Sequence, residues 1–312
     1  MSGEGDSGDT DATVYAQTAL HTNTTPSPLH SAVYNGDAHQ VADLIEKGAS
    51  VVGTIVGGQT PLHTAVRLCA VPNERLAIIR ELIQSRHPHK ADISAVDDLG
   101  NNALHYAACE HKQVLAFILD KTPQGPALDQ TLGACNDAGC TPLVLAVKAG
   151  NIGVVEILLK LPGSAVGAAD KRGATALHHA AELTPYDDAT VEGMSLKIAQ
   201  LLLDNTNTDV TACTLDEDTA LHYAASRGSE ALVKLLVERA GPGADAKNSE
   251  GNTPLELAKL SNARATSSNE QLRFAGFPGH TANRYAVITA LDTRSASTKR
   301  PDPSEHVGAR VW

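Results

Sequence analysis

The chemistry that this sequence could perform depends first on its histidines, of which it has 13. Five of them occupy the same position in a phrase that recurs along the chain: His30, His63, His105, His178 and His222. A catalytic or metal site is built once, at one place, whereas these five histidines stand at the same position of successive copies. A structural role is therefore the better interpretation, and as buried polar rings they would need hydrogen-bond partners.

The other possible metal ligands have unsuitable spacing. His178 and His179 are neighbours, and neighbours on a helix point about 100° apart instead of toward one face. Cys135 and Cys140 bracket one turn, but they do not form a C-x-x-C pair and no second pair follows. The loop SRHPHK, which starts at Ser85, holds two histidines where a fortuitous site is conceivable. We predict neither a bound metal nor a cofactor.

The sequence also lacks the local motifs of common enzymes. It contains no phosphate-binding loop, no G-x-S-x-G, no H-E-x-x-H and no dinucleotide-binding fingerprint. Neighbouring carboxylates such as Asp97 and Asp98, or Asp216 to Asp218, fall at predicted hairpin tips, where a solvated loop explains them. No nucleophile, base and pocket converge, so we predict that the chain is not an enzyme.

Charge and composition narrow the possible partners and location. The formal net charge of −11 argues against nucleic acid, because no basic surface dominates. The chain begins with an acidic segment in place of a secretory signal, and no run approaches 18 apolar residues, so we predict no membrane partner. The five cysteines are thinly spread, as expected in a reducing compartment. These features favour the cytoplasm, with the nucleus left open.

A recurring phrase sets the architecture. The words GQTPLHTAV at Gly58 return as GCTPLVLAV at Gly139, GATALHHAA at Gly173 and GNTPLELAK at Gly251. Glycine suits a turn with a positive φ, threonine caps a helix through its hydroxyl, and proline is tolerated at the first helical position. A second apolar pattern of helical period follows each phrase. Copies recur every 33 to 44 residues, the spacing of helix-pair repeats with insertions.

These words resemble the ankyrin repeat. The resemblance rests on TPLHTA at Thr60, NALHYAA at Asn102, TALHHAA at Thr175, TALHYAA at Thr219 and GADAKNSEG at Gly243. It implies an all-α solenoid of antiparallel helix pairs, joined by β-hairpin-like loops, with a concave binding face. It also implies that the repeated histidine starts each first helix and hydrogen-bonds the adjacent turn or the preceding Thr or Ser.

The resemblance divides the chain into three parts. Residues 1–26 are expected to form a flexible acidic tail, because they carry four acidic residues and no Lys or Arg. Residues 27–292 are expected to hold about seven repeats, the last interrupted by an insertion at 262–280, and residues 293–312 a C-terminal tail. Val144 and Glu256 replace the usual histidine, and Glu217 replaces a turn glycine, where strain is expected.

Three kinds of position are free to vary between repeats. They are the position after each repeated histidine, the position three residues further on, and the hairpin tips. The candidate partner contacts from these positions are Tyr34, Arg67, Tyr106, Leu145, His179, Tyr223, Ile55 and Val56. An acidic excess at the tips would steer a basic partner. For Tyr106 and Tyr223 the alternative is that they pack between repeats. The sequence thus favours a protein-binding scaffold or adaptor; a structural subunit of a large assembly and a regulatory subunit of an enzyme remain alternatives.

Overall fold

A computed structural model describes residues 27–55, 57–68, 72–84, 90–110, 112–183, 189–262 and 286–292. Within these ranges the chain is helical and contains no strand; two isolated bridges, Ala169 with Thr175 and Cys213 with Thr219, are its only β-type pairs. The predicted all-α fold is confirmed. The chain divides into two compact units, residues 1–165 and 166–312, which are described separately.

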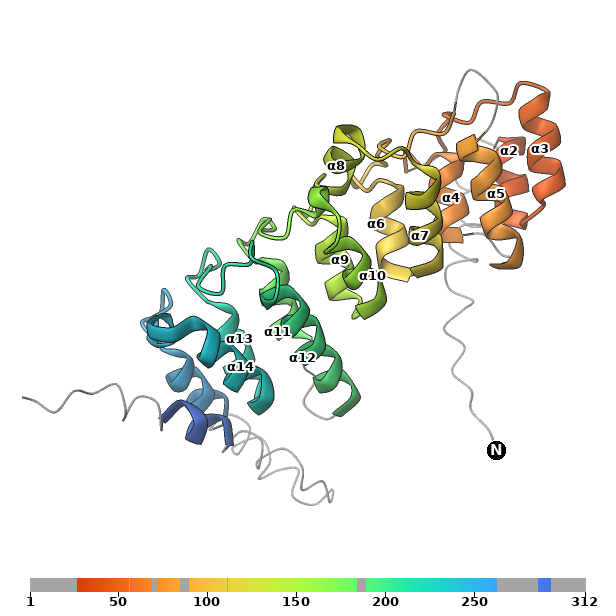
Figure 1. Ribbon diagram of the computed structural model, residues 1–312. Coiled ribbons are helices and arrows are strands. Elements are labelled where there is room, and N and C mark those ends of the chain that lie inside the picture. The colour runs from red at the N-terminus through yellow and green to blue at the C-terminus, as the bar shows by residue number, and fades with distance from the viewer. Residues whose placement is uncertain are drawn as a thin grey trace, which may run out of the picture. The chain divides into compact units, whose positions relative to one another are not determined.

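The first unit consists of helix pairs and one additional helix (Figure 1). Its elements are α2 (Pro28–Asn35), α3 (Ala38–Glu46), α4 (Pro61–Leu68), α5 (Pro72–Gln84), α6 (Ala103–Glu110), α7 (Lys112–Lys121), α8 (Pro126–Leu132), α9 (Pro142–Lys148), α10 (Ile152–Leu158) and the 3-10 helix η1 (Pro162–Ser164). The first helices α2, α4, α6 and α9 pack against one another in that order, and the second helices α3, α5, α7 and α10 do the same. We call these the first-helix layer and the second-helix layer.

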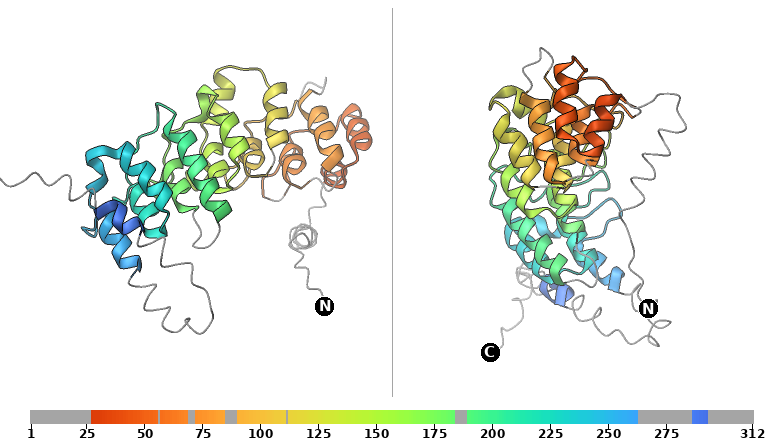
Figure 2. Two further views of the ribbon diagram at one scale, coloured as in Figure 1. Left: turned by 60° about the horizontal axis from the view of Figure 1, so that its bottom comes forward. Right: turned by 90° about the vertical axis from the view of Figure 1, so that its right-hand side faces the viewer.

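The second unit repeats the arrangement (Figure 2). Its elements are α11 (Ala176–Glu182), α12 (Ala189–Leu203), α13 (Ala220–Arg227), α14 (Glu230–Ala240) and the 3-10 helix η2 (Gly241–Asp245), followed by helical residues 254–262 and 286–292. The helix at 286–292 lies where the second helix of the seventh repeat was predicted. Lys259 Nζ pairs with Asp292 Oδ1 at 3.2 Å, which joins these last two helical segments.

The recurring phrase folds locally as its residue types predict. Pro61 and Pro142 stand at the first positions of α4 and α9, and the Thr141 hydroxyl accepts the N–H of Val144 (3.3 Å). The turn glycine before α4, Gly58, has φ of +70°. Glu217, which takes this turn position in a later repeat, has φ of +61°, a conformation that is rare for residues with a side chain. The strain expected at Glu217 is therefore present.

Each unit has a core of aliphatic side chains between its two layers. Leu62, Leu104 and Leu143, which follow the phrase prolines or their equivalents, are at most 1% exposed. Second-helix residues such as Leu82 and Leu158 are also fully buried. The small residues of the first helices let neighbouring helices approach closely, and this accounts for a chain with only 3% aromatic residues.

Hairpin-like turns connect the pairs, and backbone hydrogen bonds join each tip to the next within a unit. In the first unit Asp98 N–H donates to the Gly57 carbonyl oxygen (2.9 Å) and Asp137 N–H to that of Leu99 (3.0 Å). In the second, Leu215 N–H donates to Arg172 O (2.9 Å). Each tip is thus positioned by its neighbour.

The insertions have different outcomes. The segment that starts at Lys121 forms α8, whose residues Leu128, Thr131 and Leu132 are buried. The predicted tails at 1–26 and 293–312 and the segment 263–280 lie outside the described residues, as does the histidine loop at 85–89. None of the described helices is long and apolar enough to span a bilayer.

Candidate functional site

The five repeated histidines each join two parts of the structure. In four of them the ring Nδ1 accepts the backbone N–H at the start of its own helix; for His63 this donor is Thr60 (3.1 Å). Because Nδ1 accepts and a carbonyl oxygen can only accept, Nε2 carries the proton and donates it. The five acceptors are the carbonyl oxygens of Gln59, Asn101, Cys140, Asp218 and Asn252, at 3.0–3.1 Å. Each acceptor lies in the following hairpin, so each ring joins the start of its own helix to the next repeat.

Burial keeps these rings neutral. Desolvation lowers the pKa of His30, His63, His105, His178 and His222, although the hydrogen bond to the carbonyl oxygen opposes the shift. The effect is largest for His105, whose pKa falls to about 4. Protonation of Nδ1 would also turn an acceptor into a donor facing a backbone N–H. These histidines are therefore poor candidates for acid–base chemistry near neutral pH.

Two repeats replace the histidine in different ways. Val144 has no ring nitrogen, so the fourth repeat keeps only the threonine cap. Glu256 retains half of the histidine's role, because its carboxylate accepts the N–H of Thr253 (2.7 Å) and the Thr253 hydroxyl (2.9 Å). Hydrogen bonds from Thr253 lower the pKa of Glu256. Glu256 is thus a helix cap in this structure.

A carboxylate in two of the hairpins connects the turn to the next first helix. Asp97 Oδ1 accepts the N–H groups of Leu99 and Asn101 (both 2.9 Å), and Asp170 Oδ1 accepts those of Arg172 and Ala174 (both 2.9 Å). The second oxygen of each carboxylate is then available to the side chain after the repeated histidine. These side chains are Tyr106 and His179, two of the predicted partner contacts.

Tyr106 combines a structural and an exposed role. Its hydroxyl donates to Asp97 Oδ2, and its ring packs edge-on against His63 with centroids 6.0 Å apart. The Arg67 guanidinium lies over the same ring, 5.5 Å from its centroid. Burial and the Asp97 carboxylate raise the pKa of Tyr106 to about 12, so the hydroxyl remains protonated. The ring is half-buried and held in one orientation, with Arg67 on the first-helix layer beside it.

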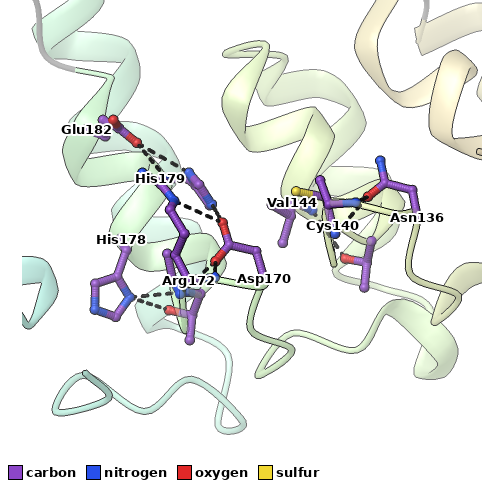
Figure 3. A network of polar contacts seen from close by, with 12 residues as sticks. Asn136, Cys140, Val144, Asp170, Arg172, His178, His179 and Glu182 are labelled. Carbon is purple, nitrogen blue, oxygen red and sulfur yellow. Dashed lines mark hydrogen bonds and ion pairs between the residues drawn. The ribbon is translucent and has the colours of Figure 1, made fainter. Parts of the chain in front are cut away.

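His179 lies inside the second unit, which contradicts its expected place on a contact surface. Its side chain is 1% exposed, with Nε2 at 3.0 Å from Asp170 Oδ2 and Nδ1 at 3.5 Å from Glu182 Oε2. Figure 3 shows the ring between these two carboxylates, with Arg172 beside Asp170. Burial opposes ionisation of Asp170, but backbone N–H groups and His179 outweigh it and lower the pKa of Asp170. The sequence position alone could not show that contact with Asp170 would hold the His179 ring in the interior.

The other predicted contacts are distributed over both units. Tyr223 packs edge-on against His178 (5.7 Å between centroids), so the packing alternative holds for both tyrosines, each of which remains half-buried. Tyr34 and Leu145 are half-buried on α2 and α9. Ile55 is also half-buried and takes the hairpin position of Asp97, with its N–H donating to Gln59 O (3.0 Å). Val56 lies outside the described residues.

The hairpin tips carry charge and exposed apolar groups. Asp98, Asp137, Asp216, Glu217 and Glu250 are exposed acidic tip residues, and Lys171 and Arg172 are exposed basic ones. Val96, Leu99 and Leu215 are 53%, 62% and 77% exposed. These apolar tip residues were not among the predicted contacts, although each stands directly beside the turn. In the described part of the chain no group of three or more His, Cys, Asp or Glu side chains could hold a metal ion.

Comparisons with known proteins agree with this geometry. A family model described as "Ankyrin repeats (3 copies)" matches residues 29–131, 124–191 and 188–266. The human B-cell lymphoma 3 protein is 32% identical over 285 residues, 89% of this chain and 52% of that protein, and the mouse nuclear factor NF-kappa-B p105 subunit is 35% identical over 148 residues, 47% and 14%. The chain therefore spans about half the length of the first relative. The chain is also similar to the crystal structure of the ankyrin repeat domain of Bcl-3, which is described as a unique member of the IkappaB protein family. The TM-score is 0.60, the sequences are 30% identical, and the match covers 86% of this chain and 98% of the Bcl-3 chain.

Proposed function

Because this chain belongs to the ankyrin-repeat family, we propose that it is a non-enzymatic scaffold or adaptor that binds a protein partner through its first-helix layer and hairpin tips. Stacked ankyrin repeats form extended concave surfaces, which repeat proteins of this kind use for binding. The proposal includes no catalytic step, and it assigns no metal, nucleic acid or membrane as a partner. A solenoid leaves these surfaces free to vary because its core is covered by the neighbouring repeats.

The observation that carries the proposal is the arrangement of Arg67 on Tyr106. Within the described residues no carboxylate pairs with the Arg67 guanidinium, which retains its hydrogen-bond donors while it lies over the Tyr106 ring. Asp97 orients that ring by accepting the hydrogen bond of the Tyr106 hydroxyl. A partner that contacts this pair loses little side-chain entropy on binding, because both groups are already held in place. Tyrosine and arginine are also the residue types that most often dominate binding energy.

Further candidate contacts lie on first helices within each unit. Tyr34 and Leu145 lie on first helices of the same unit, and Tyr223 lies on a first helix of the second unit. The exposed acidic tips support a partner with basic groups at its edge. His179 is not part of the proposal because its ring is buried.

The relatives suggest which partner to test first. One is a subunit of nuclear factor NF-kappa-B, and the crystallised Bcl-3 domain is described as a member of the IkappaB family. We therefore propose NF-kappa-B proteins as the first partner class, and a location where such proteins occur, in the cytoplasm or nucleus.

Arg67→Glu is expected to weaken partner capture at least tenfold, because it reverses the charge of a group that is otherwise available to the partner. The measurement is affinity purification of the tagged chain, followed by titration against the captured protein and against a purified NF-kappa-B protein. Arg80→Glu is the matched control, because Arg80 lies over the Phe117 ring at 5.6 Å but belongs to the second-helix layer. It should leave binding unchanged.

Equal loss of binding in Arg67→Glu and Arg80→Glu would contradict the proposed surface. The two alternatives give different results in the same experiment. A structural subunit would be recovered only within one large assembly, and a regulatory subunit would co-purify with an enzyme activity that is lost when this chain is removed.

A further inference from the structure

The insertion helix α8 helps to form a cavity of about 470 Å³ in the first unit. One wall is the hairpin arm of Asp92, Ile93 and Ser94, and the other is the segment from Thr122 to Ala134, which includes α8. Figure 1 shows α8 as a separate helix at the turn end of the helix pairs. The volume lies within the range of about 300–1,000 Å³ that is usual for ligand pockets. The helix pairs alone would not create this cavity, because α8 belongs to neither layer.

Buried contacts hold α8 in position and thereby fix the shape of the cavity. Leu128 and Leu132 are 2% and 1% exposed, and the fully buried Asn102 side chain donates to the Thr131 carbonyl oxygen (3.1 Å). On its other side α8 packs against η1, where Gly163 is so close that a Cβ there would lie 2.3 Å from Asp129 Cα. The wall of the cavity that α8 forms is thus held by buried contacts.

The lining selects a cationic side chain with an apolar stem. Among the described residues that line the cavity, Asp92 is the only ionisable one. Its Oδ1 accepts the N–H (2.8 Å) and hydroxyl (2.7 Å) of Ser94, and this fixes the direction of the carboxylate. Ile93, Ala127 and Leu128 supply apolar surface. Lysine and arginine side chains combine a methylene stem with a charged head and match both features.

The hairpin beyond the cavity indicates that the occupant is a peptide segment. Val96 is 53% exposed and stands two residues after Ser94, so it lies within about 7 Å of it along the chain. Leu99, which is 62% exposed, follows in the same hairpin, beside the exposed carboxylates of Asp98 and Asp137. A small molecule in the cavity would leave these apolar groups in water, whereas a peptide with apolar residues next to its basic residue would cover them.

We propose that this cavity, together with Val96 and Leu99, is a docking site for a basic residue flanked by apolar residues in an extended segment of a partner protein. It deepens the proposed function, on which it rests, by adding a second contact whose charge preference is the opposite of that at Arg67. The partner would therefore present separate acidic and basic segments to this chain.

The test is titration of the isotope-labelled full chain with the peptide acetyl-Gly-Leu-Lys-Gly-Leu-Gly-amide, followed by NMR at the amides of residues 92–94 and 126–132. The expected result is shifts at these amides, with Kd at least tenfold weaker when the lysine is replaced by norleucine or by glutamate. Ala127→Phe, which fills the cavity from the exposed start of α8, should abolish the shifts, and so should Asp92→Asn.

Asp209→Asn is the matched control. Asp209 makes the same turn with Thr211, accepting its N–H (2.8 Å) and hydroxyl (2.7 Å). It lies in the second unit, where none of the described helices corresponds to α8. This variant should bind the peptide as the unmodified chain does. Thermal unfolding followed by circular dichroism verifies that each variant is folded.

Equal affinity for the three peptides, absence of shifts at residues 92–94 and 126–132, or an equal loss in Asp209→Asn would overturn the inference. These results would leave the proposed function intact if Arg67→Glu still weakens partner capture. If Arg67→Glu does not weaken partner capture but the peptide still binds, the proposed partner surface on the first helices is contradicted and the docking site at the cavity is supported.

Discussion

At the scale of single residues, the histidine ring in the first helical turn connects two repeats. Nδ1 of His63 accepts the N–H of Thr60, and Nε2–H donates to the Asn101 carbonyl oxygen in the next hairpin. The Nδ1 bond requires the neutral ring, because a protonated Nδ1 cannot accept. Four histidines share this bond and His30 shares the Nε2 bond, so the folded state favours neutral imidazoles at these positions.

Stability is expected to fall as the pH is lowered from about 6.5 toward 4. In the unfolded chain these histidines titrate near pH 6.5, whereas burial lowers their pKa in the folded chain, to about 4 for His105. Between these values the unfolded state binds more protons, so acidification favours unfolding. At about 1.4 kcal/mol per pKa unit, His105 alone accounts for a loss of about 3 kcal/mol. Urea unfolding at pH 7.5, 6 and 5 measures the effect.

The same titration with His105→Val identifies the origin of the effect. This variant should lose about 1–3 kcal/mol at pH 7.5, because Asn102 N–H loses its acceptor and the Cys140 carbonyl oxygen keeps only the N–H of Asn136, and it should then lose less on acidification. The exposed His39, changed to valine, serves as the control and should leave the pH dependence unaltered. A flat profile in the unmodified chain would contradict neutral, buried rings.

At the scale of elements, the insertion helix α8 shows how a departure from the repeat becomes part of the core. Gly125 and Pro126 start the helix, and Leu128 and Leu132 are buried against the first unit. The close approach of η1 requires glycine at residue 163. Sequence patterning did not reveal α8, because seven residues are too few to display a helical period clearly.

Gly163→Ala is expected to destabilise the chain by about 1–3 kcal/mol, the usual cost of overpacking a core. A Cβ at this position would lie 2.3 Å from Asp129 Cα and 2.6 Å from its carbonyl oxygen, so α8 or η1 must move. Gly193→Ala is the matched control inside α12, where a Cβ meets nothing within 4 Å. That change should stabilise the chain by about 0.5–1 kcal/mol. Denaturant midpoints compare them, and equal shifts would be inconsistent with the contact between α8 and η1.

At the scale of the whole molecule, stability is expected to come mainly from contacts between neighbouring repeats, because each repeat packs mainly on the next within its unit. The two compact units contain their own cores, with Leu104 fully buried in the first and Leu221 3% exposed in the second. These leucines occupy the same position of the recurring phrase. Truncation of either leucine should therefore destabilise chiefly the unit that contains it.

Leu104→Ala is expected to cost about 2–5 kcal/mol of unfolding free energy through the cavity it leaves. Hydrogen exchange should accelerate most in α4, α6 and α9, and much less in α13 and α14, because local opening precedes global unfolding. Leu221→Ala should give the reverse distribution. Uniform acceleration across both units in either variant would indicate a single cooperative core.

Much of this fold could be read from the sequence because the repeat is encoded locally. Turn glycine, capping threonine, first-turn proline and the apolar periods each act within a few residues, so the helix pairs and the strain at Glu217 could be predicted. The candidate partner-binding surface was harder to predict from the sequence. Tyr106 and His179 occupy the same repeat position, yet one ring is half-buried beside Arg67 and the other is enclosed.

The amino-acid sequence by itself determined the repeat, its helix pairs and the neutral polar ring at the start of most of them, since short-range capping and periodicity are sufficient for these. Only the tertiary structure decided that Asp170 and Glu182 enclose His179, that Arg67 lies over Tyr106, and that α8 and the arm at Asp92 form a cavity. The physical reason is that each of these depends on groups from different elements, whose separation in space is fixed by packing and not by spacing along the chain.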